Sequence, residues 1–390
     1  MTDAIRRPVP GIASRHSVRT STGRHVLLCI LAVTLAFTIG WLIGPSMQPA
    51  IPTVAAAARV APHILEGNGK RGPRGMMWIP GGEFQMGSDQ RVARPNEGPV
   101  HRVRVHGFWM DRTPVTNAQF AAFMAVTGYL TTAERPPTWD SLKVQLPPGA
   151  SRPLKDTLVP GAMVFVGTSR PVDLNDYTQW WRYVPGANWR HPLGPGSSIV
   201  KMDDYPVVQV SYEDALAFAH WVNKRLPTEA EWEFAARGGL EQATYAWGDE
   251  LAPRGQRMAN VWDKSEQRFP IVDSRSDQMH APTRVCTFPP NGYGLCDMTG
   301  NVWQWNADWY RADAYRVALQ ASTPIVDPPG PSDSYDPDEP GVPQNAPKRA
   351  IRGGSFLCSP DYCVSYRPSA RRGADPYSSM SHIGFRLVSW

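Results

Sequence analysis

The chain has 390 residues, including 39 prolines, 33 glycines and fifteen tryptophans, and carries a formal net charge of +5. That much proline and glycine interrupts long periodic elements, so we expect a loop-rich domain with short helices and strands around an aromatic core. The positive charge comes mostly from the N-terminal tail, and there is no glycine-rich phosphate loop or basic-aromatic strand pattern. The composition therefore argues against a nucleic-acid partner.

Three segments of different character precede the expected domain. Residues 1–25 form a basic tail with five arginines, residues 26–44 are an uncharged apolar run, and residues 45–73 are a Pro-, Ala- and Gly-rich linker. Nineteen residues just suffice to cross a bilayer as a helix. The positive-inside rule keeps the basic tail in the cytoplasm. We therefore expect one transmembrane helix that anchors the rest on the periplasmic or lumenal side, with a cleaved signal peptide and secretion as the alternative.

Residues 74–390 contain no internal repeat or clean boundary, which predicts one domain. Residues 77–88 predict a strand broken at a Gly-Gly turn, and the alternation over 102–106 is typical of a half-buried strand. Three helix starts follow, marked by the capping residues Thr116, Ser211 and Thr228. The Pro- and Asp-rich stretch 326–348 predicts a solvated surface loop.

Four of the five cysteines lie in the expected exported part, and Cys29 lies in the apolar run. An even number in an oxidising compartment permits two disulfides. Ser-Pro-Asp-Tyr separates Cys358 from Cys363, and proline suits the second position of a type I turn, so these two thiols can meet. They would make either a disulfide or a site for a soft, low-coordinate metal such as Cu(I). A four-cysteine zinc site with Cys286 and Cys296 is weaker, because the paired short spacings of zinc sites are absent.

Several sequence blocks resemble the sulfatase-modifying-factor family. They cover residues 78–87, 226–233, 291–295, 300–305, 352–356 and 384–386. The longer stretch 158–192 is similar to the formylglycine-generating enzymes of that family. The resemblance implies a single irregular α+β domain with little regular secondary structure, related to C-type lectins. It also implies conversion of a cysteine in a Cys-x-Pro-x-Arg motif of sulfatases into Cα-formylglycine, with molecular oxygen and Cu(I).

The resemblance further implies roles for individual residues. Cys358 and Cys363 would hold Cu(I), with Ser355 and Trp303 beside them and Tyr362 and Arg367 near the site. A turn hydroxyl and a core aromatic are the plainer interpretations of Ser355 and Trp303. Two structural Ca²⁺ sites are implied, the first from Asn260, Asp277 and the carbonyls of Val261 and Met279, the second from Asp297, Gln304 and the carbonyls of Gly300 and Val302.

Some positions depart from the family pattern. The family usually has Asn and Glu where this chain has Asp297 and Gln304, and His-x-Ser where it has residues 359–361. Tyr377 and His382 replace an acidic residue and an Asn near the substrate groove, which leaves peptide specificity open; His382 is otherwise a hydrogen-bonded core histidine.

The expected partners are a sulfatase polypeptide, molecular oxygen and the membrane, with the protein a monomer. Two other functions stay open at this point. One is a non-catalytic, lectin-like binding or envelope-assembly module with a Cys358–Cys363 disulfide. The other is an oxidoreductase of the same fold that acts on a different thiol substrate.

Overall fold

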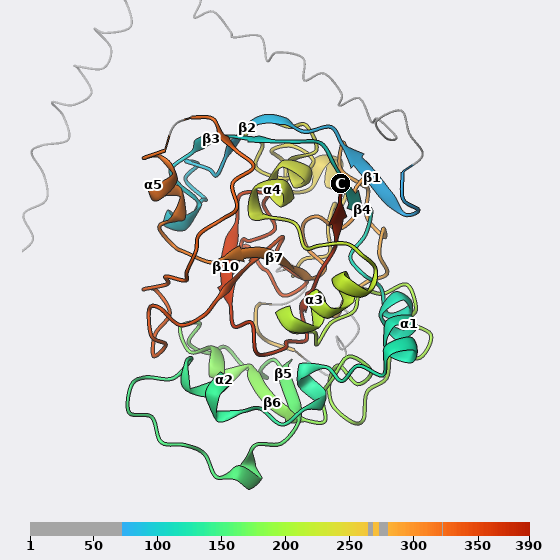
Figure 1. Ribbon diagram of the computed structural model, residues 1–390, viewed down its shortest axis with the longest axis vertical. Coiled ribbons are helices and arrows are strands. Elements are labelled where there is room, and N and C mark those ends of the chain that lie inside the picture. Colours follow the sequence, from blue (N-terminus) through green and yellow to red (C-terminus); the bar gives the residue numbers. More distant parts are fainter. Residues whose placement is uncertain (1–71, 264–267, 273–279, 322) are drawn as a thin grey trace, which may run out of the picture. The chain divides into compact units, whose positions relative to one another are not determined.

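The computed structural model describes residues 72–263, 268–272, 280–321 and 323–390 (Figure 1). The predicted tail, the predicted membrane segment and nearly all of the predicted linker lie outside these residues, as do Asp277 and Met279. Within the described ranges, no helix is long and apolar enough to cross a membrane.

The strands of the described domain are short and form four small sheets. Two sheets have three strands, in the orders β1 (Met76–Ile79), β4 (Phe108–Asp111), β12 (Val388–Ser389) and β2 (Gly82–Met86), β3 (His101–Val105), β8 (Ile325–Val326). The third sheet has the order β10 (Arg371–Ala374), β9 (Arg349–Arg352), β7 (Trp303–Trp309), β11 (Ile383–Gly384). The fourth is the antiparallel pair β5 (Gly161–Phe165) and β6 (Trp181–Pro185). This mixture of small sheets and short helices confirms the predicted single domain of mixed helix and strand content.

The helices are α1 (Asn117–Thr127), α2 (Trp139–Lys143), α3 (Tyr212–Trp221), α4 (Glu229–Arg237) and α5 (Ala314–Ala318). The three predicted caps are confirmed, because the side chains of Thr116, Ser211 and Thr228 each accept a hydrogen bond from the third backbone N–H of their helix. Figure 1 shows α1 and α3 on one side of the domain and β5, β6 and α2 together at one end.

The strand predictions near the N-terminus are also confirmed. The predicted strand 77–88 is split into β1 and β2 at a turn where Gly81 has a φ of 71°. A Cβ on Gly81 would lie 2.6 Å from the backbone nitrogen of Gly107, so only glycine fits this turn. In β3 the side chains alternate between buried and exposed, as the sequence predicted.

Helix α4 is buried along its whole length and carries charges into the interior. It contacts β2, β3, β7 and β9, and Figure 1 shows it among these strands. The carboxylate of Glu233 lies 2.5 Å from the guanidinium of Arg352 and 2.6 Å from that of Arg237, while Glu229 pairs with Arg371. Removing one member of such a buried set leaves an uncompensated charge. These pairs therefore tie α4 to β9 and β10, the strands before and after the Cys358–Cys363 turn.

The prediction of a solvated loop over 326–348 is only partly right. Most of the segment is exposed or half-buried, but Lys348 is 2% exposed and Ser334 is also buried. The ammonium of Lys348 lies 2.6 Å from Asp336 and also pairs with Glu339. The loop is therefore fastened to the domain by a buried lysine, which its composition did not indicate.

Candidate active site

Cys358 and Cys363 meet at the predicted turn and form a disulfide, with 4.7 Å between their Cα atoms. The carbonyl of Ser359 accepts N–H groups from Tyr362 at 3.4 Å and from Cys363 and Val364 at 3.1 Å. The first of these is the hydrogen bond that closes a β-turn. Both cysteines are buried, at 1% and 6% exposure. The sequence thus predicted correctly that the two sulfurs come together.

Ser355 builds the turn that holds Cys358 from the other side. Its carbonyl accepts the Cys358 N–H at 2.9 Å, and its hydroxyl accepts the Leu357 N–H at 3.2 Å. The carbonyl of Cys358 in turn accepts the Trp262 N–H at 3.1 Å. Ser355 is fully buried, so in this structure its hydroxyl acts as a turn hydroxyl beside Cys358.

Gly354, which precedes this turn, has a φ of 70°. A Cβ at Gly354 would lie 2.8 Å from the backbone carbon of Ser365, just after Cys363. The Gly-Gly pair therefore allows the two chain segments that carry the cysteines to approach closely.

Two arginines hold the chain around Cys363, and the first is Arg94. Its guanidinium donates to the carbonyl of Tyr362 at 3.1 Å and to that of Cys363 at 3.5 Å. Burial lowers the pKa of Arg94 to about 10, so this side chain stays charged at neutral pH. A positive charge therefore lies beside the cysteine pair, where it would favour a thiolate over a thiol.

The second is Arg367, one of the residues predicted to lie near the site. Its Nε donates to the carbonyl of Val364 at 2.9 Å, and its guanidinium lies 2.5 Å from the carboxylate of Glu97. The hydroxyl of Ser369 also donates to Glu97, at 2.8 Å. Glu97 ends the short 3₁₀ helix η1 (Pro95–Glu97) and is fully buried. Arg367 thus positions the backbone after Cys363.

An aromatic wall, defined here as Phe165, Trp180, Trp262, Phe269 and Tyr362, lies beside the cysteine turn. Tyr362 stacks on Phe269 with 4.6 Å between ring centroids, and Trp180 meets both of these rings edge-on at 5.6 Å. Phe165 stacks on Phe269 at 6.0 Å. Trp180 is fully buried, and its Nε1 has no hydrogen-bond partner among the described residues. The wall gives the site an apolar side that excludes water.

Trp303, the other predicted catalytic residue, lies in the same buried cluster as the two cysteines. Its N–H donates to the carbonyl of His382 at 2.9 Å. The His382 ring packs on Trp181 at 4.8 Å, and its Nδ1 is buried without a hydrogen-bond partner among the described residues. Burial lowers the pKa of His382 to about 3, so the ring is neutral. The prediction of a hydrogen-bonded core histidine is therefore right about burial and wrong about the hydrogen bond at Nδ1.

A groove of about 630 Å³ borders β5. Met163 of β5 lines it and donates its N–H to the carbonyl of Ser379 at 3.0 Å, while two residues further along β5 Phe165 donates its N–H to the hydroxyl of Ser381 at 3.2 Å. Tyr377 also lines the groove, as expected for a residue near the substrate. One end of β5 therefore lies at the groove and the other in the aromatic wall.

The fold and the cysteine turn can now be compared with known proteins. A family model described as the sulfatase-modifying factor enzyme 1-like domain matches residues 63–389. The chain belongs to this family.

Two relatives are named formylglycine-generating enzyme. The one from Mycobacterium tuberculosis is 45% identical over 315 residues, which are 80% of this chain and 96% of that protein. The one from Thermomonospora curvata is 44% identical over 318 residues, 81% of this chain and 93% of that protein. A Bos taurus relative named inactive C-alpha-formylglycine-generating enzyme 2 is 37% identical over 80% of this chain and 87% of that protein. The names of the first two support an enzyme, and the third shows that the site residues must be weighed separately.

The sulfatase-modifying-factor family implies a copper ion, and the donor set at the cysteine turn fits one. Two buried sulfurs converge there, and soft sulfur ligands at low coordination number suit Cu(I) once the disulfide is reduced. The zinc alternative is wrong for the described part of the chain. There, no group of three or more His, Cys, Asp or Glu side chains could hold a metal, and Cys286 pairs with Cys296.

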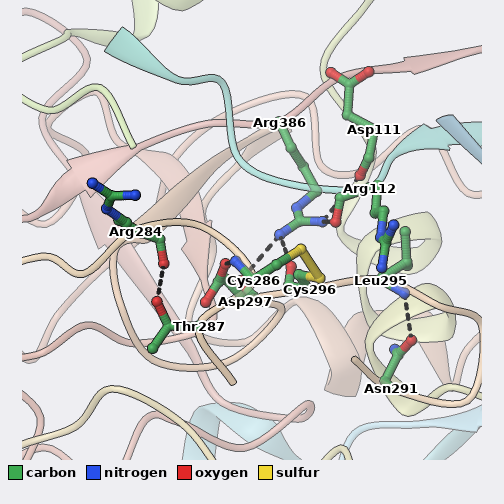
Figure 2. The surroundings of a disulfide bond; sticks show 10 residues. All are labelled: Asp111, Arg112, Arg284, Cys286, Thr287, Asn291, Leu295, Cys296, Asp297 and Arg386. Atoms are coloured by element: carbon green, nitrogen blue, oxygen red, sulfur yellow. Dashed lines mark hydrogen bonds between the residues drawn. A yellow bond between two sulfur atoms is a disulfide. The ribbon is translucent and has the colours of Figure 1, made fainter. Parts of the chain in front are cut away.

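The Cys286–Cys296 disulfide, with a Cα–Cα distance of 5.0 Å, answers a question that the sequence left open. Figure 2 shows its surroundings. The N–H of Cys286 donates to Asp297 Oδ2 at 2.8 Å, and the guanidinium of Arg386 donates to the carbonyls of Cys296 at 2.7 Å and Asp297 at 3.0 Å. The bridge therefore helps to hold the residues predicted to bind the second calcium ion.

Those residues do not fit calcium. The side-chain oxygen of Gln304 already accepts hydrogen bonds from Trp232 Nε1 at 2.9 Å and Arg386 Nε at 2.7 Å, and its nitrogen donates to the Asp297 carbonyl at 2.7 Å. Both lone pairs of that oxygen are thus used. Gly300 and Val302 lie in the same segment, but the charged group nearest to Gln304 is a guanidinium.

The first calcium site is only half described. Asn260 and Val261 lie close to the cysteine turn, because the next residue, Trp262, donates its N–H to Cys358. The side-chain nitrogen of Asn260 donates to the carbonyl of Ala281 at 2.9 Å. Asp277 and Met279 lie outside the described residues, so this site stays a prediction.

The sequence reasoning missed Arg94, Glu97, Trp262 and Asp375, which surround the turn and the groove. Arg94 and Glu97 act on residues about 270 positions away in the chain. No local spacing signals such contacts. The only available hint was a charged pair, Arg94 and Glu97, that flanks a proline in a segment without regular structure.

Proposed function

We propose that this chain oxidises a cysteine of sulfatase polypeptides to Cα-formylglycine with molecular oxygen, using Cu(I) held by Cys358 and Cys363. The observation that carries the proposal is the convergence of these two buried sulfurs in a turn fixed from both sides. Relatives named formylglycine-generating enzyme, matched over most of both chains, support it.

When bound, Cu(I) supplies the redox chemistry that lets molecular oxygen react with a thiol-bearing carbon. The protein's own residues prepare the site for it. Arg94 places a positive charge by the carbonyl of Cys363, which favours the thiolate. Trp180 and Tyr362 exclude water and so strengthen electrostatic interactions at the cysteine pair. The disulfide must take up two electrons before both sulfurs can bind a metal.

The net reaction also fixes what else is required. The substrate CH₂–SH group becomes CHO, its sulfur leaves as H₂S, and one O₂ is reduced. Oxidation of that carbon releases two electrons, whereas full reduction of O₂ to water takes four. A thiol reductant must therefore supply the other two electrons and two protons, which yields one formylglycine, one H₂S and one H₂O.

The remaining parts of the proposal concern the cell. Residues 26–44 would anchor the protein with its domain on the periplasmic or lumenal side, where secreted sulfatases pass. A structural Ca²⁺ would bind at Asn260 and Val261 together with Asp277 and Met279, and the protein would act as a monomer.

The test uses the full-length chain, reduced and loaded with Cu(I), and a Cys-x-Pro-x-Arg peptide in air with a dithiol. Mass spectrometry should show the aldehyde product. Cys358→Ala and Cys363→Ala should abolish it, whereas the matched pair Cys286→Ser with Cys296→Ser should retain it. Undiminished activity of either alanine variant would refute the proposal.

The disulfide between Cys358 and Cys363 favours one second candidate, a non-catalytic binding module that uses the bridge as a structural link. This candidate predicts that the reduced protein takes up no Cu(I) in competition with a Cu(I) chelator, and that no peptide is converted. A panel of other thiol peptides separates the third possibility, an oxidoreductase with a different substrate.

A further inference from the structure

The groove beside β5 has a volume of about 630 Å³, enough for several side chains of a peptide. Its charged lining consists of three carboxylates, Asp140, Glu213 and Asp375, and one guanidinium, Arg135. Such a lining attracts cations and repels anions.

Two of these carboxylates already have cationic partners. Asp140 lies 2.6 Å from the ammonium of Lys143, and Glu213 lies 3.7 Å from Arg135. Asp375 differs, because no Lys, Arg or His among the described residues lies within ion-pair distance of it. Asp375 is therefore the carboxylate of the groove that lacks a counter-charge.

The surroundings of Asp375 hold its carboxylate in place. Its Oδ1 accepts the side-chain amide of Gln145 at 3.1 Å and the N–H of Tyr377 at 3.0 Å. Its side chain is half-buried, and uncharged donors partly compensate the charge. A cation that enters the groove would thus find a fixed acceptor, which costs little conformational entropy on binding.

A second polar group in the groove also lacks a partner. Ser379 is only 3% exposed and lines the groove, and its hydroxyl has no hydrogen-bond partner among the described residues. Buried hydroxyls normally have partners, so this one is free to meet a polar group of a ligand.

The groove lies at the right distance from the cysteine pair for the proposed substrate. Phe165, at one end of β5, belongs to the aromatic wall with Tyr362, while Gly161, at the other end, lines the groove. These two residues are four steps apart in an extended strand, about 13 Å. The Cys and Arg of a Cys-x-Pro-x-Arg segment are also four steps apart, again about 13 Å when extended.

We propose that Asp375 is a specificity-determining residue, which pairs with the substrate arginine while the substrate cysteine lies at the Cys358–Cys363 turn. This inference rests on the proposed function and assigns one of its specificities. An arginine fork can bind a carboxylate through two hydrogen bonds, and the Ser379 hydroxyl lies in the same groove to receive the peptide.

The experiment compares two peptides with the full-length chain. One contains Cys-x-Pro-x-Arg and the other has citrulline, an uncharged analogue of similar shape, in place of arginine. Binding is measured by fluorescence anisotropy with unloaded protein, and conversion is measured separately with Cu(I)-loaded protein. The wild type should bind and convert the arginine peptide roughly tenfold better or more. Asp375→Asn should lose this preference, whereas the control Asp140→Asn should keep it.

Equal binding of the two peptides by the wild type overturns the inference, as does an unchanged preference in Asp375→Asn. If the wild type binds with the expected preference but converts neither peptide, the proposed function fails and the Asp375 assignment stands. If Asp375→Asn does not fold, Asp140→Asn and Glu213→Gln decide, because loss of the preference in either variant would assign the arginine to another carboxylate.

Discussion

Single residues around Cys363 carry large loads because they bring charge into the interior. Arg367 and Glu97 are both buried, and Arg367 holds the carbonyl that follows Cys363. The stability of the domain and the geometry of the cysteine turn are thus coupled through one ion pair.

Glu97→Gln keeps the shape of the side chain and removes its charge, which leaves Arg367 as an unpaired buried cation. We expect the free energy of unfolding to fall by about 3–5 kcal/mol, measured by denaturant titration. Glu83→Gln serves as the matched control, because Glu83 pairs with Arg102 and Arg104 at the surface and its loss should change stability little. Equal effects of the two variants would contradict the role given to the buried pair.

His382 makes stability depend on pH in a defined direction. Burial lowers its pKa in the folded protein from 6.5 to about 3, so the unfolded chain binds a proton first as pH falls. The stability contributed by neutral His382 is complete above pH 6.5 and is lost progressively between pH 6.5 and 3. Burial also lowers the pKa of His101, so the wild type alone does not isolate the effect.

In His382→Asn the free energy of unfolding should therefore fall less steeply than in the wild type over this pH range. Chemical denaturation at a series of pH values measures it. Identical slopes for the two proteins would show that His382 is not buried as a neutral ring.

At the scale of elements, the features set by neighbouring residues could be predicted from the sequence, and those set by distant residues could not. Thr116, Ser211 and Thr228 cap their helices through groups three residues away, so their spacing was sufficient. The Cys358–Cys363 turn was predictable for the same reason. Arg94, Asp375 and the buried Lys348 were not, because their partners lie elsewhere in the chain or their burial depends on tertiary packing.

The loop between Cys286 and Cys296 is an element whose order depends on a covalent bond. The bridge spans a sequence separation of 10, so the loop-entropy relation gives a stabilisation of about 3 kcal/mol. The Cys286→Ser, Cys296→Ser double variant should lose about this much in urea unfolding under oxidising conditions. The difference should disappear when both proteins are reduced, and its persistence there would assign the loss to packing.

At the scale of the whole molecule, the predicted membrane segment gives a test that needs no activity. When the full-length chain is expressed, an anchored protein should stay in the membrane pellet after alkaline carbonate extraction. Deletion of residues 26–44 should release it. A shortened chain in the exported soluble fraction would indicate cleavage instead, and a full-length chain in the cytosol would contradict export altogether.

The pairing of β12 with β4 has a consequence for synthesis of the protein. Val388 and Ser389 join a sheet whose other two strands lie before residue 112, and Trp390 packs its ring over Arg225. A nascent chain therefore cannot complete this sheet until the ribosome has released its last residues. A tag fused directly after Trp390 would press on a finished part of the fold, so a long flexible spacer or an N-terminal tag is the safer choice for producing the protein.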